Sequence, residues 1–96
     1  MTATFFATKN DQNVDLDDYE IRLSNVNAAR VQRALGVHLD DGDQPAGELS
    51  LDDFLSALAH GYHTAGDQSD MRLYLNTLNS LWGAAADAGA DTICWG

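Results

Sequence analysis

The sequence predicts an α+β domain in which a small antiparallel sheet of about three strands carries three helices on one face. Residues 2–9 (TATFFATK) are rich in β-branched and aromatic side chains, and residues 19–24 (YEIRLS) alternate apolar and polar side chains like a half-buried strand. The middle of the chain changes to the 3.6-residue period of amphipathic helices, and the last residues, DTICWG, return to a strand composition. The expected order is therefore β-β-α-α-α-β, over one domain from residue 1 to residue 96.

The two N-terminal strands are expected to form an antiparallel hairpin. The segment between them, NDQNVDLDD, is polar, and its Asn and Asp side chains favour turns because they can hydrogen-bond their own backbone. The C-terminal strand contains Ile93, Cys94 and Trp95, and a terminal strand stays ordered only when it joins a sheet. We therefore expect it to lie beside the hairpin.

The first helix is predicted to begin at Ser24 or Asn25, either of which can cap its N-terminus. It is expected to end before Gly36, because glycine is favoured at the left-handed position that follows a helix. The apolar face of this helix consists of Ala28, Val31, Ala34 and Leu35.

The second helix has the clearest N-terminal signal in the chain. Ser50 is a favourable N-cap, and Asp53 at the third helical position can complete a capping box. Leu49 and Phe54 have the spacing of a hydrophobic staple. Asp52 and Asp53 also lie in the first turn, where the helix dipole favours a negative charge by ~0.3–1 kcal/mol. The predicted apolar stripe is Leu51, Leu55, Leu58 and Tyr62.

The third helix is predicted over about residues 70–88 and follows the loop TAGDQS. Gly89 provides its stop. The inner face is expected to carry Met71, Leu75, Leu78, Trp82 and Ala85.

Net charge is the most unusual property of the sequence. Fifteen acids and five bases give a formal charge of −10, and Lys9 is the only lysine. A field of this sign repels nucleic acid and anionic membranes and attracts basic protein surfaces. It also keeps a small protein soluble, and in a salty habitat the self-repulsion is screened. Function and habitat are therefore both open explanations of the acidity.

The chain is expected to be cytoplasmic. Its single cysteine, Cys94, excludes an internal disulfide framework, so nothing implies an oxidising compartment. The N-terminus lacks the charged and apolar regions of a secretory signal. No segment approaches the ~20 apolar residues that a membrane helix needs.

His60 and His63 are the best candidates for metal ligands, because residues three apart share a helix face. Asp67 or His38 could supply a third ligand. Zinc sites on a helix usually have i, i+4 spacing or use cysteine pairs, and the sequence has neither. The acidic loop DDGDQPAGE does not fit a calcium loop, since Pro45 and Ala46 occupy positions 5 and 6. We expect no metal and no other cofactor.

No catalytic constellation is apparent, and the chain is expected not to be an enzyme. Cys94 lies between Ile93 and Trp95 in a predicted strand, where a thiol is usually an inert small hydrophobe. The sequence contains no glycine-rich phosphate loop and no nucleophile elbow. Direct nucleic-acid binding is also not expected, because such binding needs a basic patch and the arginines are scattered. These are Arg22, Arg30, Arg33 and Arg72.

The remaining function is binding to another protein. If acids from separate segments converge on one face, they could mimic the charge of a phosphate backbone and occupy the basic channel of a nucleic-acid-handling protein. In size and charge the chain resembles the small acidic inhibitors of bacterial defence nucleases, including anti-CRISPR proteins, although no motif carries this likeness. The predicted partner-binding residues are Asp15, Asp17, Asp18, Glu20, Asp40, Asp41, Asp43, Asp52 and Asp53.

Two alternatives remain open at this point. The chain could be a structural or accessory protein that self-associates through an apolar patch, and it could be a monomer or a homodimer. A histidine-based metal-binding protein is the third possibility, with His60 and His63 as its candidate ligands.

Overall fold

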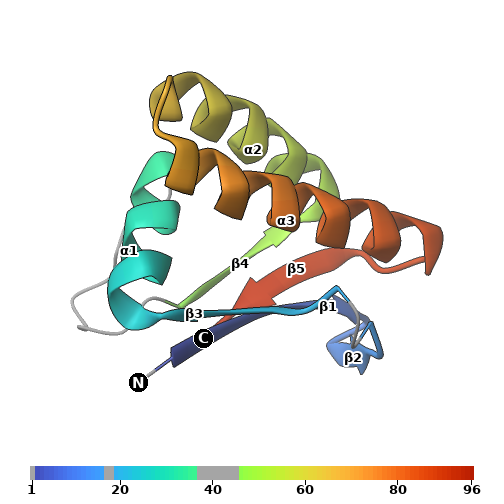
Figure 1. Ribbon diagram of the computed structural model, residues 1–96. Coiled ribbons are helices and arrows are strands. Elements are labelled where there is room, and N and C mark those ends of the chain that lie inside the picture. The colour runs from blue at the N-terminus through green and yellow to red at the C-terminus, as the bar shows by residue number, and fades with distance from the viewer. Residues whose placement is uncertain (1, 17–18, 37–45) are drawn as a thin grey trace.

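The computed structural model (Figure 1) describes residues 2–16, 19–36 and 46–96. Over these residues the chain forms an α+β fold with three helices and a five-stranded antiparallel sheet, so the predicted fold class and helix count are confirmed. The predicted number of about three strands is too low. The elements are β1 (Thr2–Lys9), β2 (Gln12–Val14), β3 (Ile21–Ser24), α1 (Asn25–Ala34), β4 (Gly47–Ser50), α2 (Leu51–Ala65), α3 (Ser69–Asp87) and β5 (Thr92–Trp95).

Strand β1 is the centre of the sheet. On one side it pairs with β3 along its first half and with β2 along its second half. On the other side it pairs with β5, which in turn pairs with the edge strand β4. The expected pairing of β1 with β3 and the expected position of the C-terminal strand beside β1 are both present, but β1 and β3 do not form a hairpin, because β2 lies between them in the chain. In the central row Phe5 lies opposite Ile21 on one side and opposite Trp95 on the other.

The two additional strands lie in segments that the sequence predicts as turn and loop. Asn10 and Asp11 both have positive φ, 51° and 65°, and form a two-residue turn that lets β2 fold back on β1. Turns of this kind match the right-handed twist of a hairpin, and Asn and Asp tolerate left-handed backbone. Strand β4 has only four residues and no β-branched residue, so its pairing with β5 is what makes it a strand.

The helices cover one face of the sheet (Figure 1). Alternate residues of the two central strands point toward them and are buried, while the residues between are less covered, except Thr8, which is also buried. No helix in the described part of the chain covers the opposite face. The inward residues of β1 and β5 are Ala3, Phe5, Ala7, Ile93 and Trp95.

The predicted helix caps are confirmed. The backbone N–H of Asn27 donates to Ser24 Oγ at the start of α1, and that of Asp53 donates to Ser50 Oγ at the start of α2, each over 3.2 Å. Gly36 follows α1 with a φ of 79°. Side-chain caps of this kind typically stabilise a helix by ~1 kcal/mol.

The buried stripe of α2 differs from the predicted one. Its buried residues are Phe54, Leu58, Gly61 and Ala65, whereas Leu55 is 44% exposed. The buried face of α2 is therefore rotated about the helix axis relative to the predicted face. Gly61 explains this rotation, because a Cβ at this position would lie 3.1 Å from Leu75 Cδ2 of α3. The missing side chain lets α3 approach closely on this side of α2. A similar shift occurs on α3, where Leu81 is fully buried and Trp82 only partly.

Trp95 joins the sheet to two helices. Its indole stacks on Phe5 at a centroid distance of 5.5 Å and contacts Phe54 of α2 at 6.3 Å. Its Nε1–H donates to Oε1 of the buried Gln32 of α1 over 3.0 Å. The indole also covers Gly47, because a Cβ there would lie 2.5 Å from Trp95 Cζ2. Trp95 therefore requires a glycine at the start of β4.

Gly47→Ala is expected to lower the free energy of unfolding by ~1–3 kcal/mol, because the added methyl overlaps the Trp95 ring and the core must shift. Gly83→Ala is the matched control. A Cβ at Gly83 meets no atom within 4 Å, and alanine favours a helix interior by ~0.5–1 kcal/mol, so this variant should be more stable than the parent. Urea denaturation of both variants measures the difference. An equal change in the two variants would contradict the close packing of Trp95 on Gly47.

Candidate functional site

Acids from four segments lie at one end of the sheet. The turn of the β1–β2 hairpin, the residue before β5, the first turn of α2 and the end of α3 all meet there. The α3 and hairpin ends are on the right in Figure 1. We call this group the acidic end, and it consists of Asp11, Asp52, Asp53, Asp87 and Asp91.

Asp91 connects the segments of the acidic end. Its backbone C=O accepts from Leu51 N–H over 3.1 Å, and its own N–H donates to Thr8 C=O over 3.0 Å. Its carboxylate accepts from Asn10 N–H over 3.0 Å and from the Thr92 hydroxyl over 2.8 Å. These bonds hold Asn10, which precedes Asp11, and Leu51, which precedes Asp52, against Asp91. They are the reason that acids distant in the sequence become neighbours.

The hydrogen bond from Asn10 N–H, followed by that from Thr92, lowers the pKa of Asp91. A carboxyl whose pKa is lower in the folded state stabilises the fold above the ordinary aspartate pKa of about 3.9, and this contribution is lost as the pH falls through the folded-state pKa. In the Asp91→Asn variant the free energy of unfolding should therefore decrease less steeply than in the parent as the pH is lowered into the acid range. Urea denaturation at several pH values measures it, with Asp87→Asn as the exposed control. If the free energy of unfolding decreased equally with falling pH in the parent and in Asp91→Asn, the contribution of the Asp91 carboxylate would be contradicted.

The predicted partner-binding acids have different positions. Asp52 and Asp53 are exposed and belong to the acidic end. Asp15 follows β2 and Glu20 precedes β3, and both are exposed at the other edge of the sheet. Three strand spacings of about 4.8 Å separate that edge from β4 and Asp52, whereas Asp11 of the acidic end lies in the turn directly before β2. The remaining predicted acids lie outside the described residues; these are Asp17, Asp18, Asp40, Asp41 and Asp43.

The bases are distributed unevenly relative to the acidic end. Lys9 lies at this end, close to Gly89. The four arginines lie elsewhere. Arg22 is on β3 opposite Thr4, and the others are on α1 or near the start of α3, which is about 20 Å from the first turn of α2 along that helix. Within the described residues the only salt bridge joins Arg30 to Asp70 over 2.9 Å. No arginine in this part of the chain neutralises the acidic end.

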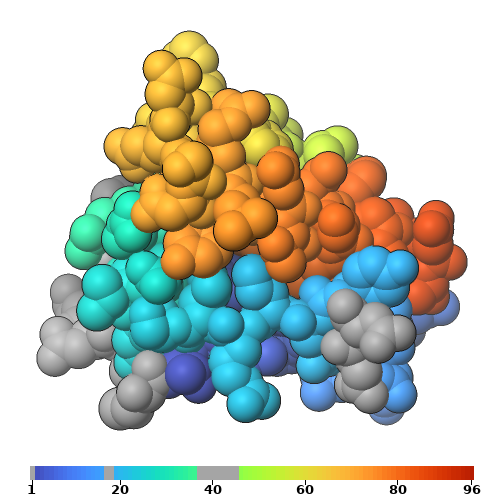
Figure 2. Space-filling view, viewed as in Figure 1, coloured from blue at the N-terminus to red at the C-terminus, as the bar shows by residue number. Residues whose placement is uncertain are grey.

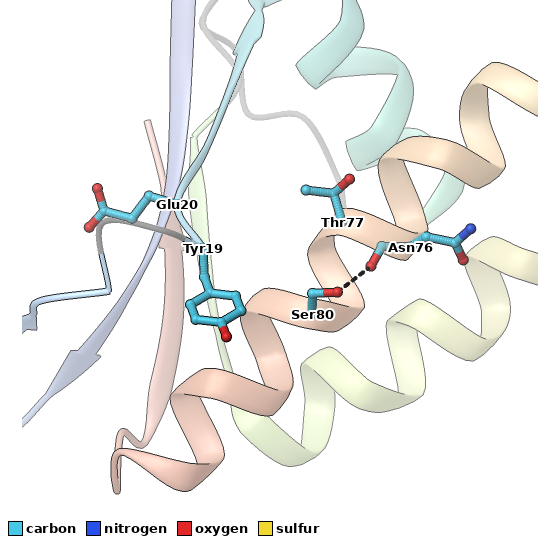
Figure 3. Close-up of a pocket in the computed structure, with 5 residues that line it drawn as sticks. All are labelled: Tyr19, Glu20, Asn76, Thr77 and Ser80. Carbon is cyan, nitrogen blue, oxygen red and sulfur yellow. Dashed lines mark hydrogen bonds between the residues drawn. The ribbon is translucent and has the colours of Figure 1, made fainter.

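A shallow polar pocket lies between the β3 edge and α3 (Figure 3). Tyr19 and Glu20 come from the segment before β3, and Asn76, Thr77 and Ser80 come from α3. The Thr77 hydroxyl donates to Leu73 C=O and the Ser80 hydroxyl donates to Asn76 C=O. Asn76 Oδ1 accepts from the Tyr62 hydroxyl over 2.6 Å. Because both hydroxyls donate to helix carbonyls, neither is bonded to a side-chain base that could activate it.

The structure describes two of the three histidines and the single cysteine, whereas His38 lies outside the described residues. His60 and His63 are both exposed on α2. Within residues 2–16, 19–36 and 46–96, no group of three or more His, Cys, Asp and Glu side chains could hold a metal ion. Burial raises the pKa of the Cys94 thiol, and the negative charges of Glu48, Asp11 and Asp91 raise it further, against the lowering effect of the Thr8 hydroxyl. A raised pKa keeps this thiol protonated and weakly nucleophilic.

Comparison with known proteins gave no match. No protein-family model matches the sequence, and no curated protein and no solved structure is significantly similar to the chain. None of the helices in the described part of the chain is both long and apolar enough to span a bilayer. The function must therefore be inferred from the residues and their arrangement.

Of the acidic end, sequence reasoning found Asp52 and Asp53 and missed the other three. Asp11, Asp87 and Asp91 are each isolated from the acidic runs in the sequence. The signal that could have found Asp11 is the Asn-Asp pair, since these residues favour a two-residue hairpin turn. The position of Asp91 directly before the last strand was the other available signal.

Proposed function

We propose that this chain is a non-enzymatic protein-binding protein that docks by its acidic residues on a basic, nucleic-acid-handling protein. In this proposal it acts as an inhibitor of the anti-CRISPR or another anti-defence type, and it occupies the partner's basic channel as a DNA mimic. The observation that carries the proposal is the acidic end, where five carboxylates from four segments lie together with only Lys9 as a nearby base. A surface of this kind steers toward a positive patch and raises the association rate.

The spacing of the acids supports a combined field. Asp11 is in the turn after β1, Asp91 precedes the neighbouring strand β5, and Asp52 follows β4, which is next to β5. Neighbouring strands lie about 4.8 Å apart, which is shorter than the screening length of about 8 Å at physiological ionic strength. The charges therefore act on an approaching partner as one negative edge rather than as separate ions.

Salt dependence tests the proposal. The immobilised protein is incubated with a lysate of its source organism at 50 and 500 mM NaCl, and captured proteins are identified. We expect one or more basic nucleic-acid-binding proteins to be retained at low salt and largely lost at high salt, because exposed charges are screened. Equal retention at both salt concentrations would contradict docking by charge.

A second candidate function is self-association through an apolar patch, and one observation favours it. Val26 is 73% exposed and Leu73 is 63% exposed, the two largest exposed fractions among the large apolar side chains of the described residues. Val26 lies one turn before Arg30 and Leu73 one turn after Asp70, so they flank the ion pair that joins α1 to α3. In Figure 2, α1 (teal, on the left) borders the first half of α3 (orange).

Light scattering at 50 and 500 mM NaCl tests self-association. A dimer held by the apolar patch should persist at high salt and dissociate in a Val26→Ser, Leu73→Ser double variant. A monomeric mass for the parent protein at both salt concentrations would exclude this second function.

A further inference from the structure

A partly apolar surface lies beside the acidic end, where the first turn of α2 faces the second half of α3 (Figure 1). The indole Nε1–H of Trp82 donates to Leu51 C=O over 2.8 Å. In an α-helix such a carbonyl also accepts from the backbone N–H four residues later, which here belongs to Leu55. The Trp82 side chain is therefore held against the first turn of α2, next to Leu55. We call Leu51, Leu55 and Trp82 together the Leu55 patch.

The Leu55 patch is an open surface. Leu55 is 44% exposed, and Leu51 and Trp82 are each partly buried against the hydrophobic core. A surface of this kind does not enclose a small molecule, whereas a side chain of another protein can lie on it. Its occupant should therefore be sought on a protein partner.

Asp52 gives the Leu55 patch a charged border. Asp52 is exposed and precedes Leu55 by three residues, so the two side chains are neighbours on α2. All five lysine and arginine residues of the chain lie within the described ranges. None of the five forms an ion pair with Asp52 or lies over the Trp82 ring. The patch thus combines a carboxylate with apolar surface, and no lysine or arginine of the chain itself occupies it.

The same side of α2 has one contact between an arginine and an aromatic ring. The guanidinium of Arg72 on α3 lies 5.7 Å from the centroid of the Tyr62 ring, and Tyr62 follows Leu55 by two turns of α2. Arg72 also donates to Gly66 C=O over 3.2 Å. It precedes Trp82 by ten residues, which is about 15 Å along α3. The Leu55 patch therefore has a ring and a carboxylate for which the chain supplies no arginine.

We propose that the Leu55 patch receives an arginine side chain of the basic partner, with Asp52 binding the guanidinium and Leu55 and Trp82 packing against it. Guanidinium is planar and weakly hydrated, so it can pair with a carboxylate through two parallel hydrogen bonds while it lies against an apolar or aromatic surface. The ammonium of lysine is a strongly hydrated point charge and gains less from such a surface. This inference rests on the proposed function, and it adds a preference for arginine over lysine to attraction by charge.

Titration of the isotope-labelled protein with capped hexa-arginine or hexa-lysine at 50 mM NaCl tests the proposal through the two indole N–H signals in NMR spectra. We expect the Trp82 signal, assigned by its loss in Trp82→Phe, to shift saturably with hexa-arginine. The Trp95 signal should stay in place, because Trp95 is 3% exposed and its indole is bonded to Gln32. Hexa-lysine has the same charge and should bind about two- to fivefold more weakly, the factor expected for an exposed contact between guanidinium and an aromatic ring.

Three variants locate the preference on the Leu55 patch. Leu55→Gln should weaken hexa-arginine binding about two- to fivefold and bring it close to that of hexa-lysine. Leu73→Gln is the matched control and should bind like the parent, because Leu73 is an exposed leucine near the start of α3, away from the patch. Asp52→Asn should weaken the binding of both peptides, since it removes the bordering carboxylate.

Equal affinity for the two peptides would overturn the inference and leave docking by charge in place. An unchanged Trp82 signal at saturation with hexa-arginine, or equal losses in Leu55→Gln and Leu73→Gln, would have the same meaning. The absence of binding of either peptide at 50 mM NaCl would contradict both the inference and docking by charge.

Discussion

Trp95→Ala is expected to lower the free energy of unfolding by ~3–5 kcal/mol, the usual cost of truncating a buried tryptophan. The indole is 3% exposed, and it contacts Phe5 of β1, Phe54 of α2 and Gln32 of α1. Its loss leaves a cavity at the point where the sheet meets two helices. Because the domain is small, a loss of this size is a large part of its total stability, and the variant should be partly unfolded at 37 °C.

Urea denaturation followed by circular dichroism measures this loss without relying on tryptophan fluorescence. Trp82→Ala is the control, since Trp82 is only partly buried and its Nε1–H donates to Leu51 C=O over 2.8 Å. We expect a clearly smaller loss for this variant. Equal losses would mean that Trp95 is not the main contact between the layers.

Neutralising Asp11, Asp52 and Asp53 together to asparagine should reduce capture of a basic partner at 50 mM NaCl by at least tenfold. The three substitutions remove most of the charge of the acidic end and leave Asp91, which holds the segments together, unchanged. Binding of the captured and purified partner to the immobilised variant measures the effect. Circular dichroism checks the fold, because the loss of Asp52 and Asp53 weakens the favourable charge–dipole interaction of α2 by ~0.3–1 kcal/mol each.

A matched triple variant separates the acidic end from net charge. Asp15→Asn, Glu20→Gln and Asp67→Asn also remove three exposed negative charges but lie away from the acidic end. Equal losses of binding in the two triples would show that overall charge governs the interaction. Neutralising Asp40, Asp41 and Asp43, which lie outside the described residues, then tests whether that segment contributes to the same docking surface.

The fold class was predictable because its signals are local. Ser24 and Ser50 cap the helices as their positions in the sequence indicate, and the first and last strands are evident from composition. Strands β2 and β4 are different, because β2 lies within a polar, turn-rich segment and β4 contains no β-branched or aromatic residue. They become strands through their neighbours β1 and β5. The error at Leu55 has a related cause, since the orientation of α2 depends on how closely α3 approaches Gly61.

The candidate site was less predictable, because its acids come together only through strand register. Asp52 and Asp53 could be identified from a local cluster. Asp11, Asp87 and Asp91 are separated by up to eighty residues in the sequence and meet only because β5 returns to pair with β1.

The separation of Lys9 and five acids from the four arginines also has a mechanical consequence. Among the described residues, charges divided in this way contribute an electric dipole in addition to the net charge. In the field of a cationic surface this contribution exerts a torque before any contact occurs, and it favours an approach in which the hairpin turn and the start of α2 lead. Orientation during diffusion therefore reduces the fraction of collisions that arrive with the wrong side forward.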